Sequence, residues 1–266
     1  MFLFYNVYSY RYTLSMEILY SLFLFAILLG TLYCIRSLRA LHGKVSKKSE
    51  QISREIHKAS IESKKMSMVA YRQTEAFIQL SSLLQFKAAI PPTRSWAASP
   101  DLLLLISETV KKTKPSLVVE LGSGVSTLVT AKSGARKVVS IDNSEEFGGK
   151  TRELLKEHKV RGVEIRIAPL RPYANGSDWY DISTIKDLKK IDLLIVDGPP
   201  GSKNPEARYP AFKEFKDKLS SKAIIIIDDV NRDGERKLAE DFAKSLPNHT
   251  LTVLDHEKGT AVISPR

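Results

Sequence analysis

The sequence predicts an α/β domain with a parallel, helix-covered sheet, preceded by a transmembrane helix and a long juxtamembrane helix. An uncharged apolar run lies near the N-terminus, and a proline-free region with apolar residues at helical spacing follows it. From Pro100 onward, apolar strand-like stretches alternate with helix-like stretches, which is typical of parallel sheets. A chain of 266 residues, 43% of them hydrophobic, can form one catalytic-size domain with a sizeable core.

The apolar run covers residues 18–35 and contains no charged side chain. A helix of that length spans about 27 Å, close to the thickness of the bilayer core. A cleaved signal peptide and a buried core helix are the alternatives, but no A-x-A cleavage site follows the run. We therefore expect a retained single-pass anchor. Residues 1–17 form a leader, of which residues 1–15 are not translated if Met16 is the true start.

Positive charge is concentrated directly after this run. The chain has a net charge of +11, and residues 36–90 contain eleven Lys and Arg against four Glu. Because positive charge flanks the cytoplasmic end of a span, we expect a membrane protein whose catalytic domain is cytoplasmic. No aromatic residues interleave with these charges, so nucleic acid is an unlikely partner. The single Cys34 excludes an intrachain disulfide and any cysteine-based metal site.

Residues 36–90 are expected to form a basic juxtamembrane helix or coiled coil. Apolar residues recur at helical spacing across 37–86, so this segment could also mediate homo-oligomerisation. Pro91 and Pro92 end the helical pattern, which places the start of the catalytic domain, residues 91–266, at this point.

Seven strands and several helices are predicted within 91–266. The expected helices are Asp101–Lys112, Ser144–His158 and Ala207–Leu219. The expected strands are Leu117–Leu121, Lys137–Ile141, Val163–Ile167, Ile191–Val196, Ala223–Ile227, Thr250–Leu254 and Thr260–Ile263.

Acidic residues, two glycines and a serine lie where these strands end. They are Glu120, Gly122, Ser123 and Gly124 after the first strand, Asp142 after the second, Asp197 after the fourth, and Asp228 and Asp229 after the fifth. Ligands bind beyond the carboxyl ends of parallel strands, and a purely structural sheet has no need to collect acids on one rim. The pattern predicts a ligand site there.

The glycine turn can be interpreted in two ways. A dinucleotide site needs a third glycine, but Thr127 stands at that position, and Glu120 would lie near a pyrophosphate. An S-adenosylmethionine (SAM) site suits the turn better, because Glu120 would hold the turn and attract the cationic methionine end. Asp142 could then accept hydrogen bonds from both ribose hydroxyls, although an acid there also occurs in NAD sites.

Four segments together resemble consecutive motifs of class I SAM-dependent methyltransferases: VVELGSGVST, VVSIDNSEEF, IDLLIVDGPPG and AIIIIDDVNR. They look most like the small-molecule O-methyltransferase-like subfamily with a DGPPG motif. The resemblance covers about residues 90–266 and implies a Rossmann-like seven-stranded sheet. It also implies cofactor contacts at Glu120, Gly122, Gly124 and Asp142, with Ser123 in the same turn and Asp197 beside the methionine moiety.

The resemblance also raises the question of a metal ion. Some relatives hold Mg²⁺ with an Asp after the fourth strand and an acidic pair after the fifth, and Asp197, Asp228 and Asp229 match those positions. Hard oxygen ligands suit Mg²⁺, which would activate a bound hydroxyl. The alternative is that Asp228 caps the next segment and Asp229 faces water.

The general base is less clearly marked. Pro199 stands where sugar-modifying relatives often carry an acid. Asp197, Asp229 and His256 are our candidate catalytic residues, with Tyr209 and Lys258 as further options.

These features predict a membrane-anchored SAM-dependent methyltransferase acting on a hydroxyl oxygen of a small molecule or saccharide precursor. The alternatives are an NAD-dependent oxidoreductase and a catalytically inactive membrane scaffold with the same fold.

Overall fold

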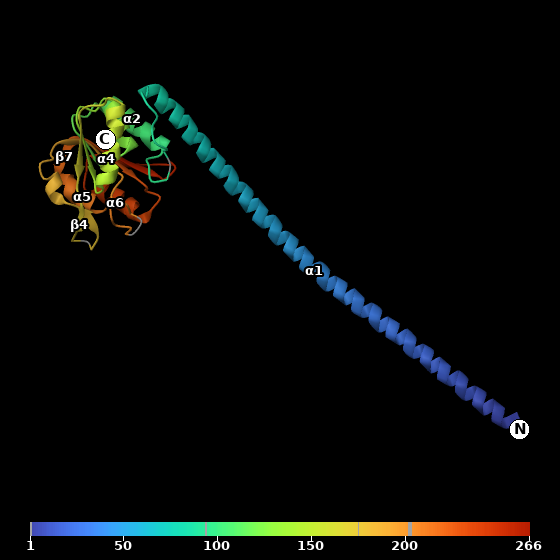
Figure 1. The fold of residues 1–266 in the computed structure, drawn as a ribbon. Coiled ribbons are helices and arrows are strands. Elements are labelled where there is room, and N and C mark those ends of the chain that lie inside the picture. The colour runs from blue at the N-terminus through green and yellow to red at the C-terminus, as the bar shows by residue number, and fades with distance from the viewer. Residues whose placement is uncertain (1, 94, 175, 202–203) are drawn as a thin grey trace. The chain divides into compact units, whose positions relative to one another are not determined.

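The structure is a computed structural model that describes residues 2–93, 95–174, 176–201 and 204–266, with side chains from residue 16 onward. The chain divides into two compact units, Met1–Ser67 and Met68–Arg266. The first unit consists of helix and the second contains the α/β domain (Figure 1).

The second unit is built on a seven-stranded sheet in the order β3-β2-β1-β6-β7-β9-β8. Its strands are β1 Val118–Leu121, β2 Val138–Asp142, β3 Val163–Ile167, β6 Ile191–Val196, β7 Leu219–Asp228, β8 His249–Leu254 and β9 Thr260–Pro265. The first five are parallel, and β9 runs antiparallel to both β7 and β8. The prediction of seven strands with a closing hairpin is confirmed.

Helices cover both faces of this sheet (Figure 1). Successive strand residues point to opposite faces, so Val118 joins one buried cluster and Val119 the other. One cluster includes residues of α2 Pro100–Thr113, α3 Val125–Lys132 and α4 Glu145–Glu157. The other includes residues of α5 Pro210–Phe215, α6 Asp233–Lys244 and the 3₁₀ helix η1 Ile182–Ile185. Burial on both faces explains the near-continuous apolar strands.

Two boundaries differ from the sequence-based expectation. The helix expected at 207–219 is limited to α5 and the 3₁₀ helix η2 Lys216–Lys218, because Pro210 fixes the first helical turn. Strand β7 begins at Leu219 rather than Ala223, and residues 220–222 are polar and partly or fully exposed. An apolar pattern therefore could not mark them as strand. A small hairpin, β4 Leu170–Pro172 and β5 Asp178–Tyr180, lies outside the main sheet.

Helix α1 covers Phe2–Leu84 and includes the apolar run 18–35. By length and composition it is the one helix among the described residues that could cross a membrane, and the apolar side chains of its most hydrophobic stretch are exposed. The leader predicted at 1–17 falls largely outside the residues whose side chains are described.

The last turns of α1 belong to the catalytic unit, which begins at Met68 rather than at residue 91. Leu80 and Leu84 are buried in the same cluster as α2 and α3. The Gln73 side-chain amide donates to Asp101 Oδ2 at 2.6 Å. Helix α1 ends at Leu84, before the prolines at 91 and 92 that were expected to end the helical pattern, and its last apolar residues complete the core.

Replacing Leu80 by alanine is expected to lower the free energy of unfolding of the catalytic unit by about 2–5 kcal/mol, because the side chain is fully buried. Urea unfolding of the full chain in detergent, followed by the fluorescence of the buried Trp179, would measure the change. Ile78→Ala is the matched control, since Ile78 lies on the same helix and is 59% exposed. Equal effects of the two substitutions would contradict this packing.

Candidate functional site

Two adjoining cavities, of about 410 and 390 Å³, lie at the carboxyl ends of β1, β2 and β6. Volumes of this size are typical of small-molecule sites. The residues shared by both cavities are Ser95, Trp96, Gly122, Ser123, Phe147 and Asp197.

Two glycines let the turns after β1 and β6 approach each other. Gly122 has a φ of +94°, and a Cβ atom there would lie 2.9 Å from the carbonyl oxygen of Asp197. A Cβ on Gly198 would meet the hydroxyl of Tyr180. Any larger residue at 122 would be strained and would push Asp197 out of place.

Glu120 lies beneath the turn and is completely buried. Its Oε2 accepts hydrogen bonds from Thr127 Oγ1 and from Ser140 Oγ, the latter at 2.8 Å. Its Oε1 has no hydrogen-bond partner among the residues that the structure describes. Burial raises the pKa of Glu120 to about 7, although the hydroxyls that donate to it act in the opposite direction. Glu120 holds the turn, as expected, but it is not among the residues that line the cavities.

Thr127 explains why the third glycine of a dinucleotide motif is missing. Its hydroxyl donates to Glu120 and accepts from the backbone N–H of Gly124 at 3.1 Å. It therefore ties the start of α3 to the end of β1. A glycine at this position would remove both bonds and leave Glu120 with one donor fewer.

Asp142 ends β2 and supports the same turn. Its Oδ2 accepts from the backbone N–H and the hydroxyl of Ser123, at 3.0 and 2.6 Å, and its Oδ1 accepts from the N–H of Ser144 at 2.9 Å. A carboxylate offers about four lone-pair sites, so roughly one remains, on Oδ1. Asp142 lines the larger cavity and keeps this acceptor position for a ligand there.

Asp197, Asp228 and Asp229 come together as predicted, with one carboxylate oxygen from each within 4.8 Å of the others. Asp197 and Asp229 line the larger cavity, whereas Asp228 is 1% exposed, and neither of its carboxylate oxygens has a hydrogen-bond partner within the described part of the chain. Asp229 has a φ of +64°, a left-handed conformation that turns its side chain back toward the cluster.

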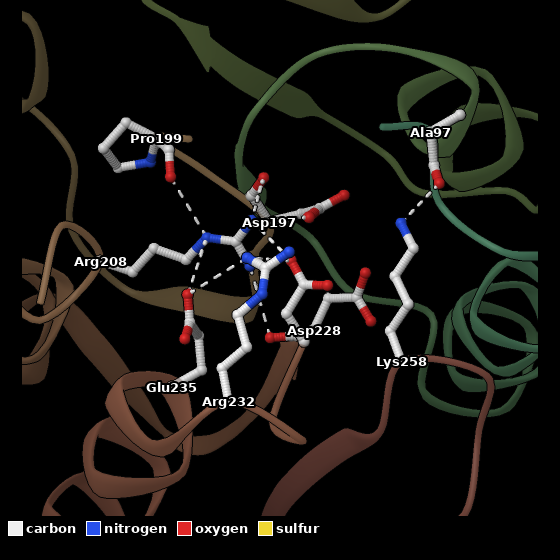
Figure 2. Close-up of polar contacts among 9 residues, drawn as sticks. Ala97, Asp197, Pro199, Arg208, Asp228, Arg232, Glu235 and Lys258 are labelled. Carbon is white, nitrogen blue, oxygen red and sulfur yellow. Dashed lines mark hydrogen bonds and ion pairs between the residues drawn. The ribbon is translucent and has the colours of Figure 1, made fainter. Parts of the chain in front are cut away.

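A buried arginine stands among these acids. Arg208 Nη2 lies 3.2 Å from Asp197 Oδ1 and 3.0 Å from Asp229 Oδ2. Figure 2 shows the Arg208 side chain reaching between Pro199 and Glu235 toward Asp197. Glu235 Oε1 lies 3.7 Å from Arg208 Nε. The guanidinium thus neutralises carboxylates from two strand ends and from the start of α6.

Two further cations border the cluster. Arg232 Nη1 lies 3.1 Å from Asp229 Oδ2, and Lys258 Nζ donates to the carbonyl oxygen of Ala97 at 2.9 Å. Burial raises the pKa of Asp197 to about 6, against the attraction of Arg208. Burial and the neighbouring charges of Asp197 and Asp229 raise the pKa of Asp228 to about 8. Burial therefore favours the neutral form of both carboxyls.

This donor set does not fit a divalent cation in the arrangement observed. One oxygen of Asp197 and one oxygen of Asp229 already lie 3.2 and 3.0 Å from Nη2 of Arg208. Three cationic side chains, those of Arg208, Arg232 and Lys258, line the same cavity as these carboxylates. We derive no chemical step through a metal.

The arrangement does fit SAM. Gly124 has no atom within 4 Å of the position where a Cβ would lie, so the backbone there is open to a ligand. Asp142 retains an acceptor toward the cavity, and the buried carboxyl of Glu120 lies behind the turn, where it favours positive charge. Asp197 lines both cavities.

His256 is not brought to this site. Its Nδ1 lies 3.0 Å from Thr260 Oγ1, burial lowers its pKa, and it lines neither cavity. Tyr209 bonds to Asp241 Oδ2 instead. Lys258 lines the larger cavity.

Sequence reasoning missed four residues of the site. Arg208 and Arg232 were counted only as charges, and no local pattern indicated that they would lie beside acids distant in sequence. Trp96 and Phe147 are exposed aromatics that line both cavities. An exposed aromatic next to the predicted domain start was the one available signal for Trp96.

Glu120→Gln is expected to flatten the pH dependence of stability. The folded pKa of about 7 exceeds the ordinary 4.5, so the wild-type chain binds more protons when folded and loses stability as pH rises from about 4.5 through about 7. The loss is on the order of 3 kcal/mol. Melting temperatures of both chains between pH 5 and 8 would measure it, with the exposed Glu153→Gln as control. The same slope in Glu120→Gln and wild type would contradict this account.

Comparisons with known proteins agree with this geometry. The family model described as a methyltransferase domain matches residues 119–230. A search of curated protein sequences finds no match. The fold is similar to the SAH-bound methyltransferase PaMTH1 of Podospora anserina, with 18% identity, a TM-score of 0.54, and coverage of 76% of this chain and 96% of that one.

Two O-methyltransferases also share the fold. The enzyme from Bacillus cereus, in complex with SAH, has 17% identity and a TM-score of 0.50, covering 73% of this chain and 91% of the other. TomG from Streptomyces achromogenes, in complex with SAM, has 16% identity and a TM-score of 0.50, covering 73% and 88%. At these identities the likeness concerns the fold.

One assignment follows from four observations: the sheet order, the glycine turn over Glu120, the acid at the end of β2 and the matching family model. Residues 119–230 of this chain match a methyltransferase domain, built on the fold of SAM-dependent methyltransferases.

Proposed function

We propose that this chain is a membrane-anchored methyltransferase that transfers the methyl group of SAM to a hydroxyl oxygen of a small molecule or saccharide precursor. One observation carries the proposal. The cavity beside Gly122, Ser123 and Asp142 is also lined by the carboxylates of Asp197 and Asp229. A methyl donor and a group that accepts a proton would therefore share one enclosed space.

When bound, SAM supplies an electrophilic methyl group on a sulfonium. The chain's main contribution is to align the acceptor oxygen with that methyl group, because holding two reactants in line removes much of the entropic barrier. Asp142 and the turn at Gly122–Ser123 would fix the donor side. Trp96 and Phe147 are placed to limit the acceptor side.

Asp197 is the best-placed proton acceptor. It lines both cavities, and its pKa of about 6 keeps it ionised at neutral pH while leaving it more basic than an ordinary aspartate. It would take the proton that the hydroxyl loses as the new carbon–oxygen bond forms. Asp229 lines one cavity and is held by both Arg208 and Arg232, so it is the weaker candidate. The position of His256 offers no support for a role in this step.

The choice of oxygen as the acceptor atom rests on chemistry and analogy. A carboxylate beside the donor suits an acceptor that must lose a proton. Two proteins that share the fold are named as O-methyltransferases. The NAD-dependent alternative is disfavoured, because Thr127 stands where a pyrophosphate site needs a third glycine and the carboxyl of Glu120 lies beneath the same turn.

Membrane anchoring is proposed from the N-terminal unit. Residues 18–35 form uncharged, exposed helix, and Lys and Arg follow directly after them. The positive-inside rule then places the catalytic unit in the cytoplasm, close to the bilayer. Lipid-linked or envelope saccharide precursors are an acceptor class that such a position favours.

Asp197→Asn is expected to lower methyl transfer by about 10²- to 10⁴-fold while leaving SAH affinity within about threefold of wild type, because it removes the base but not the donor site. Asp142→Ala should do the reverse and lose SAH binding. Calorimetric titration of the full chain in detergent with SAH measures binding, and tritiated SAM with lipid-linked saccharide pools measures transfer.

Alkali treatment of the labelled product identifies the acceptor atom, since a methyl ether resists alkali and a methyl ester does not. SAH binding without transfer to any pool would favour the inactive scaffold. An absence of SAH binding at millimolar concentration in a folded sample would reject the cofactor assignment.

The full chain is expected to stay with membranes after carbonate washing, because an apolar helix of about 27 Å is removed only by detergent. Immunoblotting of the washed pellet would check this. Protease added to intact cells should leave the catalytic unit uncut. Release into the carbonate supernatant would contradict a spanning helix.

A further inference from the structure

Arg208 makes more contacts than those of a single ion pair. Its side chain is 5% exposed, and its guanidinium contacts groups from several segments. Nε donates to the carbonyl oxygen of Pro199 at 3.3 Å, and Nη1 donates to that of Asp228 at 3.4 Å. Nη2 donates to both the carbonyl and the carboxylate of Asp197, at 3.3 and 3.2 Å. Arg208 thus joins the carboxyl ends of β6 and β7.

The position of Nη2 is the decisive feature. One nitrogen lies 3.2 Å from Asp197 Oδ1 and 3.0 Å from Asp229 Oδ2, and so it bridges carboxylates from two neighbouring strand ends. A divalent cation shared by the same two side chains would have to approach them directly beside this positive charge. Arg232 adds a second guanidinium at the same Asp229 oxygen, 3.1 Å away.

We propose that Arg208 is the resident cation of this site and takes the place of a divalent metal among Asp197, Asp228 and Asp229. Arginine stays protonated at every physiological pH, and a chelator cannot remove it. Its positive charge beside the carboxylates is therefore always present. Arg208 acts as a positioning residue, since it borders the larger cavity and its guanidinium is engaged in holding the Asp197 carboxylate there.

This inference rests on the proposed function only in naming Asp197 as the group that Arg208 positions. Its central test is metal binding, which needs neither SAM nor an acceptor. Failure of the methyl-transfer proposal and failure of this one are therefore distinguishable.

The experiment is titration of the full chain in detergent with Mn²⁺, followed by the electron paramagnetic resonance signal of the free ion. The wild-type chain is expected to leave the signal unchanged at 100 µM protein, a concentration of about 10⁻⁴ M at which typical sensor-type metal sites would fill. Arg208→Gln should bind one Mn²⁺ at least tenfold more tightly than wild type. Arg208→Gln with Asp228→Asn should lose that binding, and the exposed Arg236→Gln should match wild type.

Stoichiometric Mn²⁺ binding by the wild-type chain that Asp228→Asn removes would overturn the proposal. So would an Arg208→Gln chain that still binds SAH but gains no metal. If Arg208→Gln does not fold, Arg208→Lys provides the second variant. It keeps the positive charge and is expected to remain free of metal, and metal binding by this variant would overturn the proposal as well.

Kinetic measurements distinguish a role of Arg208 in positioning Asp197 from a role in the stability of the fold alone. Methyl transfer by the wild-type chain should be unchanged by EDTA. Arg208→Lys should lower kcat with little effect on the KM for SAM and should shift the pH profile of kcat, because a lysine lacks the Nε and Nη1 donors that hold the side chain to the carbonyls of Pro199 and Asp228. A change in stability alone, with kcat and its pH profile unaltered, would contradict the positioning role.

Discussion

The arrangement of the site depends on the neutralisation of buried carboxylates at the ends of β6 and β7. Parallel strands bring their carboxyl ends to one edge, and here that edge carries Asp197, Asp228 and Asp229. Burying like charges together is costly unless they are paired or protonated. Arg208 pairs with two of them, and burial favours the neutral form of the third. The cluster can therefore lie next to a cavity without an added ion.

The two acids near the glycine turn have different tasks. Glu120 is wholly buried and bonded to Thr127 and Ser140, so it fixes the shape of the turn and influences a ligand only through its charge. Asp142 supports the turn through Ser123 and still borders the cavity. The close approach of Gly122 to Asp197 then connects the turn to the acid cluster, which places donor and acceptor sides in one space.

Helix α1 serves both units of the chain. Its apolar residues at 18–35 are exposed, whereas Leu80 and Leu84 near its end are buried in the catalytic core. Apolar residues at helical spacing are therefore exposed in one part of α1 and buried in another. The exposed residues at 18–35 need an apolar environment outside the domain, whereas Leu80 and Leu84 are buried within it.

Much of the fold follows from the sequence alone. Apolar runs that end in acids or glycines determined the seven strands, and the rule that parallel strands align their carboxyl ends placed Gly122, Asp142, Asp197, Asp228 and Asp229 at one edge. These are local signals, carried by residues adjacent in the chain.

Only the tertiary structure decided how the charges of the site are balanced. Arg208 lies eleven residues from Asp197 and twenty from Asp228, and no spacing rule connects them. The distance of His256 from the cavities and the burial of Leu80 against α2 were equally invisible in the sequence. The reason is physical. Strand patterns depend on neighbours along the chain, whereas ion pairing and burial depend on which segments the completed fold brings into contact.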